Sequence, residues 1–73
     1  MPAGMARTFE QGDRVSWNTS QGPTHGRVVR KLTRDTKIDD HQVRASDDDP
    51  QYLVESEKTG ARAAHKPDAL TRR

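Results

Sequence analysis

The chain has 73 residues, of which 29% are hydrophobic and 33% are charged, and it contains no cysteine. This length is near the lower limit for a self-supporting core, so it predicts one domain without a deep catalytic cavity, and the lack of cysteine excludes disulfides and thiolate metal sites. The 13 basic and 11 acidic side chains leave a formal net charge of +2, which is too small to indicate a nucleic-acid partner by itself.

Residues 1–8 ("MPAGMART") contain proline and glycine and show no periodicity, which predicts a flexible leader. No apolar run approaches the roughly 20 residues needed to span a bilayer, and the N-terminus lacks the apolar core of a signal peptide. We therefore expect a cytoplasmic location and no membrane partner.

The next segment carries the pattern of a first hairpin. Gly12-Asp13 marks a turn, after which Val15 and Trp17 alternate with polar residues, as in a strand with one buried face. Residues 27–32 ("RVVRKL") are β-branched at their centre and predict a second strand. The glycines and proline of residues 21–26 predict the turn between the two strands.

The middle of the chain is more polar. In residues 35–47, Ile38 and Val43 are the only sizeable apolar residues, so the segment predicts one short strand around either of them, and whether it is strand or loop stays open. Three aspartates followed by Pro50 end this segment, because like charges repel and proline disfavours helical angles in the residue before it.

A second hairpin follows Pro50. Residues 51–56 ("QYLVES") predict a strand with Tyr52 and Val54 on one face, and the glycine that ends the loop at 57–60 can adopt a positive φ. Residues 61–65 predict the last strand, and 67–70 ("PDAL") suit a single helical turn.

Five short strands with turn signals between them predict an all-β fold, and a small five-stranded barrel would hide the sheet edges. The barrel is expected at residues 9–70, with residues 71–73 as a solvated tail. The predicted core consists of Val15, Trp17, Val28, Leu32, Ile38, Val43, Tyr52, Val54, Ala63 and Leu70.

Several of these residues together resemble one family. The run Phe9, Gly12-Asp13, Val15, Trp17, Gly26 and Val28, followed by "PQYLVES", Gly60 and "AAHKPDAL", is similar to the hypervirulence-associated protein Tudor-domain family of small, mostly bacterial proteins. The resemblance covers residues 9–70. It implies an SH3-like barrel of Tudor type that acts as a non-catalytic interaction module, and it does not name a ligand.

We expect the ligand to be a protein or peptide that binds at the rim of the barrel, near the predicted turn from Gly22 to His25. The predicted site residues are Trp17, His25, Arg27, Arg30, Lys31 and Tyr52. The alternative is weakly specific, salt-sensitive binding of nucleic acid through the basic second strand, since Arg and Lys side chains neutralise phosphates.

Other binding chemistries find less support. A cage for methylated lysine or arginine needs several aromatic rings, whereas the chain offers Phe9, Trp17 and Tyr52. Because Trp17 and Tyr52 are in phase with core valines, we expect both to be mainly structural. A half-exposed Trp17 beside Tyr52, forming a shallow aromatic patch, stays an alternative.

The residues typical of metal sites and catalysis lack the necessary spacing. Asp47–Asp49 are followed by proline rather than by the glycine of a calcium loop, and the three histidines are far apart in the chain. No nucleophile motif or glycine-rich phosphate loop is present. The sequence therefore predicts no metal, no cofactor and no enzymatic activity, and it leaves the partner and the oligomeric state open.

Overall fold

The computed structural model of the chain describes residues 8–38 and 40–73. Residues 1–7 of the expected leader lie outside the described residues. The elements in chain order are β1 (Arg14–Thr19), β2 (Gly22–Leu32), β3 (Thr36–Ile38), β4 (His41–Val43), β5 (Gln51–Ser56), β6 (Arg62–His65), the 3₁₀ helix η1 (Pro67–Ala69) and β7 (Thr71–Arg72).

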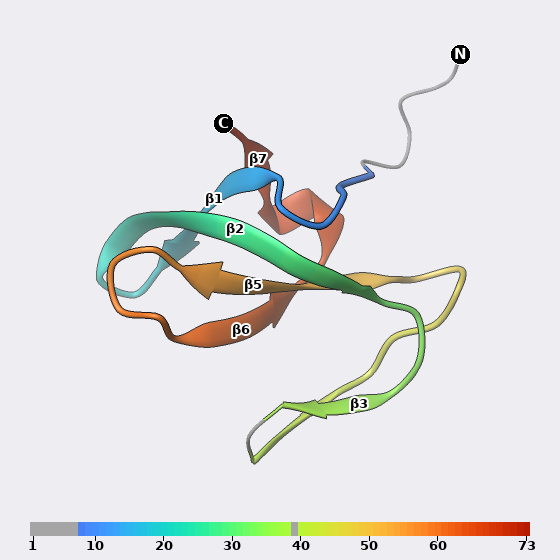
Figure 1. Cartoon of the computed structure of the whole chain (residues 1–73). Coiled ribbons are helices and arrows are strands. Elements are labelled where there is room, and N and C mark those ends of the chain that lie inside the picture. The colour runs from blue at the N-terminus through green and yellow to red at the C-terminus, as the bar shows by residue number, and fades with distance from the viewer. Residues whose placement is uncertain (1–7, 39) are drawn as a thin grey trace.

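Five strands form one antiparallel sheet in the order β6-β5-β2-β1-β7, and β3 pairs with β4 in a separate hairpin (Figure 1). The prediction of a small all-β fold is therefore confirmed. The sheet curls but does not close, because β6 and β7 are its two edges and are not paired with each other. The expectation that closure hides the sheet edges is wrong.

The first hairpin turns earlier than predicted. Thr19 faces Gly22 across the β1–β2 pair, so only residues 20 and 21 form the loop, and Gly22 has a φ of +107°. The hydroxyl of Thr19 donates to the Gly22 carbonyl over 2.8 Å and holds this turn. Pro23 lies within β2, at a stretch where β5 has not yet begun to pair, so its missing N–H costs no bond to β5. The predicted turn from Gly22 to His25 is thus part of a strand.

A β-bulge in β2 creates two cores. The register with β5 shifts between Val28 and Arg30, because Val29 is an extra residue that reverses the alternation of side chains. Val28 therefore faces the main core, whereas Leu32 faces the opposite side of the sheet. The main core contains Phe9, Val15, Trp17, Val28, Tyr52, Val54 and Leu70, and the second core contains Leu32, Val43 and Leu53.

Residues 35–47 form a hairpin that packs on the main sheet through the second core. Instead of joining the main sheet as one strand, this segment forms the β3–β4 hairpin, which projects from the sheet on the side of β6 (Figure 1). The hairpin places Val43 over Leu53, so both faces of β5 are buried. Alternation alone predicted Leu53 to be outside the core.

Most of the predicted core is buried. Ile38 and Ala63 are only partly buried, while Phe9 and Leu53 are buried without having been predicted. The N–H of Phe9 donates to the Tyr52 hydroxyl over 3.2 Å, and the two rings meet edge to face with centroids 5.3 Å apart. This contact fastens the segment before β1 to β5.

The end of the chain belongs to the sheet. Residues 71–73 were expected to be a solvated tail, but Thr71–Arg72 form β7 and pair with β1, although their side chains are exposed. Arg72 donates to the Asp13 carboxylate over 2.8 Å and lies over the Phe9 ring. The same carboxylate accepts a bond from the Glu10 N–H, which together with Arg72 lowers the pKa of Asp13. The expected helical turn is η1, followed by the fully buried Leu70.

Candidate functional site

Strand β6 is an edge of the main sheet, and its outer side offers free backbone groups. The Ser56 N–H donates to the Ala61 carbonyl over 2.9 Å, and the register places Val54 opposite Ala63. Since bonded pairs alternate along an antiparallel ladder, Ala63 points its N–H and C=O toward β5, whereas Arg62 and Ala64 point theirs away. Such an edge is a template for an additional strand.

A groove adjoins one end of this edge. It has a volume of about 430 Å³ and lies between the loop of the β1–β2 hairpin and the loop of the β5–β6 hairpin. Trp17 and Pro23 line one side, and Lys58, Arg62 and Ala63 line the other. Trp17 is only 6% exposed, so it is a core residue that also lines the groove.

A cleft adjoins the other end of the edge, where the β3–β4 hairpin stands beside β6. Its volume is about 400 Å³, and Ile38, His41 and Val43 line the hairpin side. Residues 62–65 line the other side, so Arg62 and Ala63 belong to both depressions. The groove and the cleft therefore form a path along β6.

Trp17 and His65 link the two depressions. Their ring centroids are 5.6 Å apart with planes tilted by 39°, and they connect β1 with β6 across the open side of the barrel. Trp17 lines the groove and His65 lines the cleft. Burial of the imidazole disfavours its charged form and lowers the pKa of His65 below the ordinary 6.5.

This pKa shift predicts a pH dependence of stability. Because the folded state holds His65 less basic than the unfolded chain does, the unfolded chain takes up the proton first as the pH falls below 6.5. We expect the melting temperature to fall between about pH 7 and pH 5, and to fall less in His65→Phe, which keeps a ring beside Trp17. Equal losses in the two proteins, measured by thermal melting at each pH, would contradict this assignment.

The structure disperses the predicted site residues. Trp17 lines the groove, but Tyr52 is 1% exposed and its hydroxyl accepts a hydrogen bond from the Phe9 N–H. The two rings therefore do not form an exposed aromatic patch. His25 points away from the groove, with its Nε2 atom 3.7 Å from a Glu57 carboxylate oxygen. Arg30 and Lys31 line a separate depression at the end of β2.

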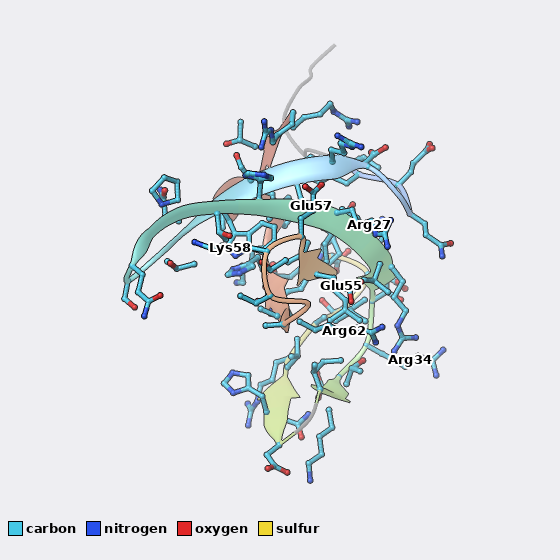
Figure 2. All side chains as sticks on the ribbon, turned by 60° about the vertical axis from the view of Figure 1, so that its left-hand side comes forward. Arg27, Arg34, Glu55, Glu57, Lys58 and Arg62 are labelled. Carbon is cyan, nitrogen blue, oxygen red and sulfur yellow. The ribbon has the colours of Figure 1, made fainter. Side chains whose placement is uncertain are left out.

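Arg27 lies in a row of charged side chains on the outer face. The register places Arg14 opposite Arg27, Arg27 opposite Glu55, and Glu55 opposite Arg62, so four neighbouring strands contribute one side chain each. We call this set the charged row. Figure 2 shows Glu55 between Arg27 and Arg62. Within residues 8–38 and 40–73, no ion pair shorter than 4.0 Å joins members of the row.

The sequence matches a known protein family over most of its length. Residues 12–70 match the family described as the hypervirulence associated proteins TUDOR domain. The chain belongs to this family. The resemblance seen in the sequence is thus confirmed, and Tudor-type domains are generally non-catalytic binding modules for peptides or nucleic acids. Separate searches of curated proteins and of solved structures found no match.

The described part of this Tudor-type domain shows neither a metal cluster nor a spanning helix. Among those residues, no three histidine, aspartate or glutamate side chains lie close enough to hold an ion. His41 and His65 line the same cleft, but His25 lies beside Glu57 on the outer face. No helix in the same residues is long and apolar enough to cross a membrane.

The edge of the Tudor-type sheet was missed by reasoning from the sequence. Residues 61–65 were predicted as a strand, but Arg62 and Ala64 carried no chemical signal that marked them as site residues. Which strand lies at an edge depends on pairing between distant segments. One signal was available: the last predicted strand had a partner in residues 51–56, but the strand that would close the barrel on its other side was not identified.

Proposed function

We propose that this Tudor-type domain is a non-catalytic module that binds an extended segment of a partner protein along β6. The segment would join the main sheet as an additional strand, a mode in which backbone hydrogen bonds provide affinity and pockets for alternate side chains provide specificity. The observation that carries the proposal is the unpaired outer edge of β6, which runs between the groove and the cleft.

The two faces of β6 offer different surroundings to such a segment. Ala63 lies on the inner face with Trp17 nearby, while Ala64 lies on the outer face against the second core. Side chains of an added strand alternate between these faces, so they would enter the groove and the cleft in turn. The small alanine side chains leave room on both sides.

The distribution of charge favours a protein partner over nucleic acid. The three basic residues of β2 that were expected to contact phosphates are split, since Arg27 lies in the charged row and Arg30 and Lys31 line another depression. Glu55 stands directly opposite Arg27. A carboxylate within the basic surface repels the phosphates of a nucleic acid, whereas a protein segment can offer charges of either sign.

A proline at position 64 tests the proposal. Because the Ala64 N–H points away from β5, Ala64→Pro removes no bond of the existing sheet, but it removes a donor from the outer edge and places a ring there. We expect short peptides selected on the wild-type protein from a random library to bind this variant at least about tenfold more weakly. Fluorescence anisotropy of the labelled peptides measures the loss.

The matched control is Ala63→Pro. Proline has no backbone N–H, so this variant loses the hydrogen bond from residue 63 to the Val54 carbonyl inside the sheet. We expect a loss of about 1–3 kcal/mol in the free energy of unfolding. Ala64→Pro should melt close to the wild-type temperature. If the selected peptides bind a folded Ala64→Pro protein as well as they bind the wild type, the edge of β6 is not the binding site.

A further inference from the structure

We infer that the segment bound along β6 carries an acidic side chain opposite Arg62 and an apolar side chain opposite Ala64, two positions away. This inference rests on the proposed strand addition and specifies the partner. The two side chains that would face the segment from the outer face of β6 are those of Arg62 and Ala64.

Strand β5 already presents this pattern to the other side of β6. In the observed register, Glu55 lies opposite Arg62 and Leu53 lies opposite Ala64, so β6 receives a Leu-x-Glu sequence from its inner neighbour. The same two side chains of β6 project from the sheet between both neighbours. An added strand with the same chemistry would therefore repeat an arrangement that the fold itself uses.

The acidic side chain of the bound segment is inferred from the excess of positive charge in the charged row. The row holds three arginines and one carboxylate, that of Glu55. Glu57 lines a depression together with Arg14, Arg27 and Glu55, whereas Arg62 is at the other end of the row, next to the open edge. In the described residues, the ion pairs of the protein lie elsewhere, at His25–Glu57, Lys66–Asp49 and Arg72–Asp13. Opposite charges in directly facing positions stabilise a pair of strands, and like charges destabilise it.

The apolar residue follows from the surroundings of Ala64. This alanine is partly buried against Leu32, Val43 and Leu53 of the second core, and the cleft beside it is lined by Ile38 and Val43. A cleft of about 400 Å³ has space for a side chain of the size of leucine. Filling it would extend the second core over the edge of β6, with a gain that grows with the apolar area buried.

A second copy of this chain fits the edge less well. Two β6 strands placed antiparallel about Ala63 would set Arg62 of each copy opposite Ala64 of the other. No carboxylate would then face either arginine. The charges therefore favour a segment from a different protein.

A synthetic peptide pair tests the inference. The first probe is acetylated and amidated Thr-Leu-Thr-Glu-Thr-Leu-Thr, in which the glutamate has a leucine two positions away on each side, so both strand directions offer the same pattern. The second probe replaces its glutamate by lysine. Amide chemical shifts of residues 62–65 report whether each peptide occupies β6, and titration gives the affinities for the wild type, Arg62→Glu and Arg14→Glu.

We expect the glutamate peptide to bind the wild type at least about fivefold more tightly than the lysine peptide, and Arg62→Glu to reverse this order. Arg14→Glu makes the same change of charge at the far end of the charged row and should keep the wild-type order. Reversal in Arg14→Glu as well would overturn the inference, because it would show a general effect of net charge.

The remaining outcomes separate the inference from the proposed function. Shifts at residues 62–65 with equal affinities for both peptides would overturn the inference and leave strand addition standing. The absence of shifts at these residues with either peptide would overturn both. Sedimentation that shows a dimer, with β6 protected in it, would also overturn the inference, because a second copy would occupy the edge.

Discussion

Replacing Gly26 by alanine is expected to destabilise the domain more than any other single substitution considered for it. Gly26 is buried where β2 begins to pair with β5, and a methyl group there would overlap the carbonyl oxygen of Glu55. Since the obstacle is backbone, no side chain can rotate away, and the strands must separate. We expect a loss of more than about 3 kcal/mol in the free energy of unfolding. A chain of 73 residues has about 4–11 kcal/mol in total, so this one substitution would remove a large share of the stability.

Gly60→Ala provides the control for this substitution. Gly60 has a φ of +77° and no neighbouring atom within 4 Å of an added methyl group, so the cost is the backbone strain alone, about 1–2 kcal/mol. Thermal and urea unfolding of both variants measure the difference. A Gly26→Ala protein that is as stable as Gly60→Ala would contradict the described contact between β2 and β5.

Truncating Trp17 to alanine is expected to cost about 3–5 kcal/mol of stability. The indole is 6% exposed, packs in the main core and contacts the His65 ring. Its removal would open a cavity between β1 and β6 and would remove the contact that joins β6 to β1 through His65. The melting temperature by circular dichroism measures the loss.

The neighbouring Asn18→Ala serves as the control, because Asn18 is exposed in the same strand and should change stability by no more than about 0.5 kcal/mol. An unchanged melting temperature in Trp17→Ala would place the indole on the surface. It would also restore the interpretation of Trp17 as primarily a ligand-binding residue.

The predictable part of the fold is the part determined by local alternation. Val15 and Trp17, and likewise Tyr52 and Val54, are two residues apart and face one core, as their spacing predicted. The family resemblance predicted the Tudor-type fold. Both kinds of signal are read along a short stretch of chain, without knowledge of what packs against it.

The parts that were not predicted depend on pairing over long distances. The bulge at Val29 reverses the alternation in β2 and sends Leu32 to a second core, and Leu53 is buried because the β3–β4 hairpin covers it. Strand β7 is two residues long and exists through its pairing with β1. No local pattern shows which of the two cores Leu32 joins, that Leu53 is covered, or that residues 71–72 pair with another strand.

The sequence predicted that the domain binds a partner at the rim of the barrel, but most of the residues it named for the site lie elsewhere. Binding at the rim of the barrel was expected, and Trp17 does line the groove, but Tyr52 is in the core and His25 and Arg27 lie on the outer face. The edge of β6 derives its chemistry from backbone groups, which every residue type possesses. Only the order of the strands shows that those of Arg62 and Ala64 are free of a neighbouring strand.

Whether partners bind along β6 is tested by mapping the binding site on the labelled protein. The labelled protein is titrated with the glutamate peptide, and separately with a pool of short DNA and RNA, each at low and at physiological salt. If a segment binds along β6, the peptide shifts the amides of residues 62–65 and the Trp17 indole at both salt concentrations. Shifts confined to Arg27, Arg30 and Lys31 with the nucleic acids, weakening as salt rises, together with none from the peptide, would contradict binding along β6.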